Sequence, residues 1–248
     1  DDRFADIMSL CLQCRACESA CPSLVPFGEA MEATRAEVDA QVRSTRSWLR
    51  RFSLTRALRM RVLLLLATIV STMLARLRLL RRLPIIGPLT TGLRPMTLPI
   101  TPVAGKSWGP DEGPVALFLS GCVADVWFSD VHRAAIDVLV RAGYRVEAPS
   151  KQTCCGALAA HSGYAADAES MAAVNIGVFA GADVIVTDVA GCGAHMASYG
   201  RYGEMGANVA SRVRDINDLV AELISQGTLP VLEATGVSLA IQDPCHLE

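Results

Sequence analysis

The sequence lacks three features that would indicate common classes of protein. No glycine pattern of the form G-x-G-x-x-G follows a predicted strand, so the fingerprint of a flavin- or nicotinamide-binding domain is missing. No apolar run reaches the roughly 20 residues of a membrane-spanning helix, and no secretory signal is visible. The 248 residues are long enough for one or two packed domains, and no dinucleotide site is predicted in them.

Acidic residues are missing from the middle of the chain. No Asp or Glu lies between Ala40 and Pro110, where twelve Arg and Lys106 are found. The rest of the chain holds ten Lys and Arg against 25 Asp and Glu. This asymmetry predicts an anionic partner for the middle segment, although we expect no nucleic-acid partner.

The uncharged run Val62–Ala75 lies inside this basic segment. As a helix it would be about 21 Å long, which is short of the roughly 30 Å hydrocarbon core of a bilayer. Three interpretations stay open: a buried helical hairpin, a surface for a partner subunit or an anionic membrane face, or a membrane-spanning helix. In the second case the Arg-rich segment 43–82 would make a peripheral membrane contact.

Four of the nine cysteines form one run near the N-terminus. Cys11, Cys14, Cys17 and Cys21, followed by Pro22, have the spacing C-x2-C-x2-C-x3-C-P of bacterial ferredoxins. This spacing predicts a [4Fe–4S] cluster, since two-residue gaps let three thiolates of one loop converge on it. Zinc sites favour two separated C-x2-C pairs, and disulfide frameworks favour short secreted chains.

The fourth cysteine of such a run ligates the other cluster in two-cluster ferredoxins. Cys21 would therefore either complete a lone cluster or reach a second one, whose run would precede Asp1. We favour the second interpretation, because the chain begins without Met shortly before the first cysteine. So many reduced thiols also indicate the cytoplasm.

The second half of the chain predicts alternating strands and helices. Strands are expected over 115–120, 144–148, 183–187 and 237–241, and helices over 130–142, 165–180 and 209–226. This alternation predicts a mainly parallel sheet covered on both faces. Together with the helical N-terminal part, the fold class is α+β with an α/β part. The expected domains are 1–42 (ferredoxin-type), 43–113 (basic segment and Pro/Gly connector), 114–235 (α/β) and 236–248 (a truncated second copy).

Five further cysteines follow predicted strands. In open α/β sheets the ligand site lies at the carboxyl ends of the strands. One buried cysteine there is usually a small hydrophobic residue, but five together with adjacent glycines favour a metal or cluster site. The expected ligands are Cys122, Cys154, Cys155, Cys192 and Cys245.

These motifs resemble the CCG cysteine-rich-domain family, and within it the iron–sulfur subunits of glycolate oxidase (glycolate dehydrogenase). The resemblance rests on the ferredoxin-type run, on Cys154-Cys155-Gly156 followed by His161, on Ala190-Gly191-Cys192-Gly193 followed by Tyr199-Gly200, and on Arg214-Asp215-Ile216. It implies a second CCG copy after Glu248. One departure is that the family pattern ends each copy with C-x2-C, whereas His195 stands here where the last thiol would be. His195 is either a ligand, as imidazole is in some clusters, or a structural residue.

The resemblance implies an electron-transfer subunit of an oxidoreductase. A separate flavoprotein subunit, which would hold the FAD, takes a hydride from a 2-hydroxy acid such as glycolate. The [4Fe–4S] clusters of this chain then pass electrons to a quinone or another membrane acceptor, which places the chain in the cytoplasm or on the inner face of the membrane. Two alternatives stay open: a catalytic CCG site, as in heterodisulfide reductase, lactate or glycerol-3-phosphate dehydrogenase relatives, and a zinc-binding scaffold.

Overall fold

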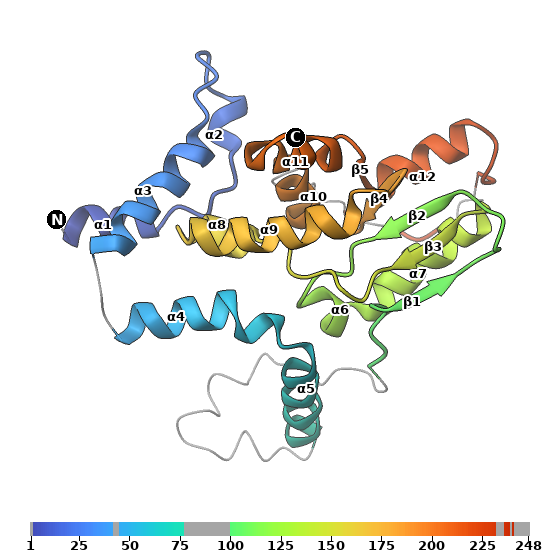
Figure 1. Ribbon diagram of the computed structural model, residues 1–248, viewed down its shortest axis with the longest axis horizontal. Helices are drawn as coiled ribbons and strands as arrows, with labels where there is room; N and C mark the ends of the chain where they lie inside the picture. The colour runs from blue at the N-terminus through green and yellow to red at the C-terminus, as the bar shows by residue number, and fades with distance from the viewer. Residues whose placement is uncertain (1, 42–44, 77–99, 232–235, 239, 241–248) are drawn as a thin grey trace.

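The structure is a computed structural model that describes residues 2–41, 45–76, 100–231, 236–238 and 240 (Figure 1). Its described part is a mixed α/β protein with one five-stranded, mostly parallel sheet. None of the helices in these ranges has both the length and the apolarity needed to cross a bilayer. Cys245 lies outside the described residues.

The N-terminal part is helical, as expected. Helix α1 (Asp2–Ser9) and the short α2 (Ala16–Ser19) flank the start of the cysteine run, and α3 (Phe27–Gln41) follows it. Arg35 links α3 to α1 and to the start of the cysteine run. Its guanidinium donates to the Met8 carbonyl at 3.0 Å and to the Cys11 carbonyl. The same side chain donates to the His161 carbonyl at 2.6 Å, which ties the cysteine run to the α/β part.

Helix α4 (Thr45–Thr55), the 3₁₀ turn Ala57–Arg59 and α5 (Arg61–Arg76) form the basic segment and run below α8 and α9 in Figure 1. The interpretation of this segment as a buried hairpin is wrong for the described residues. Leu63, Leu66 and Val70 of α5 are each more than half exposed, whereas Thr68 and Thr72 are buried. Leu64 and Leu65 are half-buried, so the face of α5 toward the protein mixes leucines with these two threonines, and the fully apolar face is exposed.

The sheet has the order β1-β3-β2-β4-β5, with β1 antiparallel to its neighbour and the other pairs parallel. Its strands are β1 (Lys106–Trp108), β2 (Val115–Phe118), β3 (Arg145–Ala148), β4 (Val184–Thr187) and β5 (Val213–Asp215). The two edge strands are short and carry charged residues, so they lack the apolar alternation that marks a strand in a sequence. For this reason the sequence predicts a connector at β1 and a continuous helix over 209–226 across β5, and both expectations are wrong.

Helices cover both faces of the sheet. Alternate strand residues enter two separate cores, with Ile185 of β4 on one side and Val186 on the other, as a period of two requires. One core packs under α8 (Ala157–His161), α9 (Ala165–Phe179), α10 (Ala190–Ala197), the 3₁₀ turn Tyr199–Tyr202 and α11 (Glu204–Ala210). The other packs under α7 (Ser129–Arg141) and α12 (Ile216–Ser225), and α6 (Ala124–Trp127) precedes α7.

The predicted helix over 209–226 is interrupted, because α11 ends at Ala210 and α12 begins only at Ile216. Asp215 caps α12, since its side chain accepts a hydrogen bond from the Asn217 N–H at 2.8 Å. The strand predicted over 237–241 is not formed where the chain is described, since residues 236–238 and 240 have no regular structure.

Candidate metal centre

Three strand ends deliver thiols to one edge of the sheet. Cys122 follows β2, the pair Cys154-Cys155 follows β3, and Cys192 lies on α10 just after β4. Strand β2 lies between β3 and β4, and the chain moves from one side of β2 to the other at this point. Such a reversal of strand order opens a crevice at the carboxyl ends, where α/β sheets bind their ligands.

The four thiols touch one another in a row. The Sγ atoms of Cys155 and Cys192 are 3.2 Å apart, and the thiol of Cys154 is hydrogen-bonded to those of Cys122 and Cys155. Cys154 and Cys155 are buried and the two outer thiols are partly exposed. No three His, Cys, Asp or Glu side chains of the described ranges already surround one point as a metal ion requires, so the row must spread to receive a metal.

The pKa values of the neighbouring thiols are shifted in opposite directions. Hydrogen bonds from the thiols of Cys122 and Cys155, and from the Gly156 N–H, lower the pKa of Cys154 well below its usual value. Hydrogen bonds to the Cys154 thiolate, together with burial, raise the pKa of Cys155 and of Cys122. The site thus stabilises one thiolate and resists a second, so a cation must supply the charge that lets further thiolates form.

Gly156 shapes the loop that carries the cysteine pair. Its φ of 97° lies in the left-handed region, and a Cβ there would lie 3.2 Å from the Ala168 carbonyl oxygen. The glycine of the Cys-Cys-Gly motif is therefore needed for its conformation and for the close approach of α9.

Replacing Gly156 by alanine is expected to lower the free energy of unfolding by about 1–3 kcal/mol, because the left-handed conformation and the crowding both disfavour a Cβ. Thermal unfolding under reducing conditions measures the change. Gly177→Ala on α9 is the control, since a Cβ there meets open space. Equal effects of the two substitutions would contradict this explanation of the motif.

Buried polar side chains hold the cysteine loops. Asn175 on α9 accepts from the Thr153 N–H at 2.9 Å and donates to the Cys154 carbonyl at 3.1 Å. The hydroxyl of Tyr199 donates to the Cys155 carbonyl at 2.7 Å. Burial raises the pKa of Tyr199, so the hydroxyl keeps the proton that it donates. The backbone of the cysteine pair is thus fixed from two elements.

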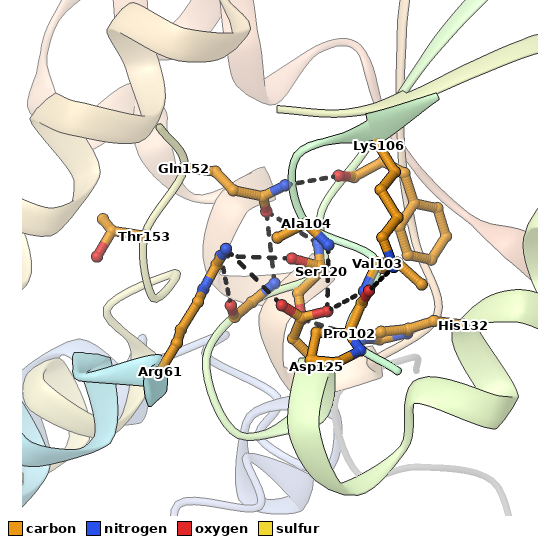
Figure 2. Close-up of polar contacts among 12 residues, drawn as sticks. Arg61, Pro102, Val103, Ala104, Lys106, Ser120, Asp125, His132, Gln152 and Thr153 are labelled. Carbon is orange, nitrogen blue, oxygen red and sulfur yellow. Dashed lines mark hydrogen bonds and ion pairs between the residues drawn. The ribbon is translucent and has the colours of Figure 1, made fainter. Parts of the chain in front are cut away.

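Two more polar residues tie the strand ends to one another. Gln152, just before the cysteine pair, accepts from the Ser120 N–H at 2.9 Å and donates to the Phe118 carbonyl at 3.1 Å (Figure 2). His132 on α7 is fully buried, with Nδ1 2.6 Å from Asp188 Oδ2 and Nε2 3.0 Å from the Ser120 carbonyl oxygen. His132 therefore links the end of β2, which leads to Cys122, with the end of β4, which leads to Cys192.

His195 lies near Cys154 and has a ring nitrogen without a hydrogen-bond partner in the described chain. It is only 4% exposed, and its Nε2 has no hydrogen-bond partner among the described residues. Burial and the positive charges of His161 and Arg201 lower the pKa of His195 to about 4, so the ring is neutral at pH 7. A neutral imidazole and four thiols form a soft donor set of the kind that iron–sulfur clusters and zinc prefer.

The N-terminal cysteine run forms a separate loop. Gln13 and Arg15 have φ values of 55° and 60°, and the Gln13 N–H points at Cys11 Sγ at 3.3 Å. Backbone N–H groups of Val25, Ser23 and Leu24 lower the pKa of Cys21. Cys14 and Cys17 are exposed, while the other two thiols of the run are partly exposed. N–H groups aimed at the sulfurs of Cys11 and Cys21 fit iron–sulfur ligands, although no contact joins the four thiols of the run in the described chain.

An ion-pair group joins the two cysteine-bearing parts. Glu32 on α3 lies 3.0 Å from Nδ1 of His161 and 2.7 Å from Nη1 of Arg201. Burial would raise the pKa of Glu32, but the hydrogen bonds and charges of His161 and Arg201 outweigh it and lower that pKa to about 2. The folded-state pKa is below the unfolded value of 4.5, so this stabilisation is present above pH 4.5 and is lost as the pH falls toward 2.

Replacing Glu32 by glutamine is therefore expected to cost roughly 1–2 kcal/mol of unfolding free energy at pH 7, allowing for solvent screening, and progressively less toward pH 3. Thermal unfolding across this pH range measures the cost. Glu37→Gln, which changes an exposed carboxylate on the same helix, should have little effect at either pH. A cost that stays constant with pH would contradict the ion-pair explanation.

The thiols were predicted from the sequence, but the residues that hold them were not. Asn175, His132 and Asp188 come from separate elements, and no spacing rule links them to the cysteines. Tyr199 belongs to the resemblance, which assigns it no role. Asn175 could have been noticed as a polar residue on the buried face of α9.

A family model described as the CCG cysteine-rich domain matches residues 116–197. The whole chain is 30% identical to "Probable glycolate oxidase iron-sulfur subunit" of Bacillus subtilis (strain 168), and covers 61% of that protein. It is 32% identical, over 57% of its length, to 28% of a fumarate reductase (CoM/CoB) subunit of Methanothermobacter marburgensis. It is 35% identical, over 54% of its length, to 56% of "Lactate utilization protein A" of Halalkalibacterium halodurans.

The chain thus spans less than two thirds of the length of each of these relatives. No solved structure matches the chain. The matched range 116–197 contains Cys122, Cys154, Cys155 and Cys192, which are the thiols that the strand ends bring into contact. Residues 116–197 of the chain are therefore similar to the cysteine-rich domain that the CCG family model describes.

Proposed function

We propose that the chain is the iron–sulfur electron-transfer subunit of a flavin-dependent 2-hydroxy-acid dehydrogenase of the glycolate type. A separate flavoprotein subunit holds the FAD, and the electrons leave for a quinone or a similar acceptor at the inner face of the membrane. The proposal is supported by relatives named as glycolate oxidase and lactate utilization proteins. The observation that carries it is the group of four sheet thiols at one edge of the sheet. The ferredoxin spacing of the N-terminal run supports it as well.

We assign the N-terminal run to a ferredoxin-type [4Fe–4S] cluster, with Cys11, Cys14 and Cys17 on one cluster and Cys21 on the same or a neighbouring one. The sheet thiols, with Cys245 from outside the described residues, would hold a second site. When bound, iron–sulfur clusters supply one-electron transfer. The chain's own residues keep the thiols in place: Asn175 and Tyr199 fix the backbone of the cysteine pair, and burial keeps water from it.

A second candidate function is catalysis at the sheet site, such as the reduction of a disulfide. The observation that favours it is His195, whose unpartnered Nε2 lies in the buried surroundings of Cys154. A zinc scaffold is the third candidate, and metal analysis separates it from the other two.

The test is the iron and acid-labile sulfide content of the anaerobically prepared chain, with EPR spectra after dithionite reduction. Cys14→Ser and Cys155→Ser should each remove the signal of one cysteine group and leave the other. Leu12→Ser, an exposed non-thiol position in the same run, should change neither. Zinc without sulfide would overturn the electron-transfer proposal in favour of a scaffold.

A further inference from the structure

Helix α5 exposes a wholly apolar face, while its face toward the protein mixes the half-buried Leu64 and Leu65 with two threonines. A surface helix in water turns its apolar stripe to the core and its polar residues to solvent. In α5 the threonines Thr68 and Thr72 are buried at 6% and 4% exposure. Thr68 also accepts a hydrogen bond from the indole of Trp127 at 3.0 Å. Five large apolar residues are exposed instead: Val62, Leu63, Leu66, Val70 and Met73.

These five residues form one continuous stripe. Positions three, four and seven apart lie on the same face of an α-helix, and the spacing of Val62, Leu66, Val70 and Met73 follows this rule. Each of the five is more than half exposed. A contiguous apolar patch of this kind marks an interaction surface rather than a random surface residue. We call these five residues the α5 stripe.

The segment that contains the α5 stripe carries charges of one sign, since no acidic residue lies between Ala40 and Pro110. Two of its arginines pair with acids of the α/β part, Arg51 with Asp167 at 2.8 Å and Arg61 with Asp125. Arg50 and Arg56 are exposed. The preceding helix α4 adds an exposed, stacked pair of aromatic rings, Trp48 and Phe52, with centroids 5.6 Å apart.

Exposed apolar residues, aromatic rings and arginines on adjoining helices are typical of a segment that lies in the surface of an anionic bilayer. If the α5 stripe bound a protein instead of a membrane, we would expect polar contacts or acidic partners along the stripe. The 16 residues of α5 span about 24 Å, which is too short to cross the roughly 30 Å hydrocarbon core. The length therefore fits a helix lying along the membrane.

We propose that the α5 stripe binds the surface of a membrane that contains anionic phospholipid. Insertion of the five apolar side chains below the headgroups would supply the apolar part of the binding. The exposed arginines would contact the lipid phosphates. The proposal deepens the proposed function, on which it rests for the direction of electron flow but not for the binding itself.

The membrane-binding helix begins at the thiol site. Arg61, the first residue of α5, donates to the Gly121 carbonyl at 3.1 Å, and its Nη1 lies 3.7 Å from Asp125 Oδ2 (Figure 2). Gly121 directly precedes Cys122, and Asp125 is fully buried, with Oδ1 accepting from the Val103 N–H at 2.7 Å. A bilayer that binds α5 would therefore lie next to the edge of the sheet that carries the thiols. This is the arrangement that a short electron path to a membrane acceptor requires.

The test is cosedimentation of the iron-loaded chain with vesicles of neutral phosphatidylcholine and with vesicles that also contain phosphatidylglycerol. We expect binding to the anionic vesicles at low salt and release at high salt, because surface charge attraction is screened within about 10 Å at 0.1 M salt. Val70→Asp should lower the bound-to-free ratio by at least about tenfold. Arg56→Gln should lower it about fivefold, the equivalent of roughly 1 kcal/mol per charge.

Matched controls exist elsewhere on the surface. Val131→Asp on α7 and Met205→Gln on α11 change exposed residues of the same types and should leave vesicle binding unchanged, whereas Met73→Gln should weaken it. Binding that is absent at low salt, or equal for neutral and anionic vesicles, would overturn the proposal. If the chain is instead dimeric and Val70→Asp makes it monomeric, the α5 stripe is a self-association surface. Normal iron content in a chain that fails to bind vesicles would reject this inference and leave the proposed function intact.

Discussion

Replacing Asn175 by leucine is expected to destabilise the protein by about 3–5 kcal/mol and to abolish metal binding at the sheet thiols. The amide is fully buried and satisfies the Thr153 N–H and the Cys154 carbonyl at once. Leucine has a similar volume but no polar atoms, so both backbone groups would be left unpaired. Each unsatisfied buried group costs about 1–3 kcal/mol, and the Tyr199 hydroxyl loses a neighbour as well.

The expected signature is selective. Thermal unfolding under anaerobic conditions should show the loss of stability, while iron analysis and EPR should show that the N-terminal run keeps its iron. Asn208→Leu is the matched control, because Asn208 is exposed on α11. A variant with unchanged stability and full iron content would show that Asn175 does not position the cysteine pair.

Replacing His132 by leucine is the second change with a large expected effect. The side chain of Asp188 is only 3% exposed, and its Oδ2 would lose the His132 ring nitrogen that lies 2.6 Å away. Its Oδ1 already has no hydrogen-bond partner in the described chain. An unpaired buried charge of this kind typically costs about 3–5 kcal/mol. The Ser120 carbonyl would lose its hydrogen bond as well, so the loops leading to Cys122 and Cys192 would no longer be linked.

A double-mutant cycle identifies the cause. If the cost comes from the stranded carboxylate, the double variant His132→Leu/Asp188→Leu should be more stable than His132→Leu alone, because no charge is then buried without a partner. Thermal unfolding of the wild type, both single variants and the double variant gives the coupling free energy. Additive effects would mean that the two residues act independently, contrary to the contact between them.

Much of the α/β part follows from the sequence because its elements are long and periodic. The helices predicted over 130–142 and 165–180 correspond to α7 and α9, and three of the predicted strands correspond to β2, β3 and β4. The thiols could be placed at one edge because parallel strands share their carboxyl ends. The sequence could not indicate β1 and β5. Each has only three residues and forms a strand through pairing with its neighbour, not through a recognisable pattern of its own.

The polar support of the site escaped prediction for a different reason. His132 lies on a helix face that also carries apolar residues, and Asp188 follows β4 as an ordinary loop residue would. Their pairing exists only once α7 packs against the sheet. Which face of α5 is exposed could not be decided from the sequence, because a hydrophobic pattern does not show which way a helix faces. Three interpretations of this segment therefore stayed open. The ferredoxin-type arrangement of the N-terminal run and the domain limits stay predictions.

The two cysteine groups also differ in how far apart their members lie along the chain. The run from Cys11 to Cys21 is local, so the cluster proposed there would need only a short loop to gather its thiols and not the sheet. Cys122 and Cys192 meet only after β2, β3 and β4 have paired through two helical crossovers. Such non-local contacts form late, because a long loop must close before any pairing stabilises it. Metal uptake at the sheet must therefore follow folding of the α/β part, so the topology imposes an order of maturation on the two sites.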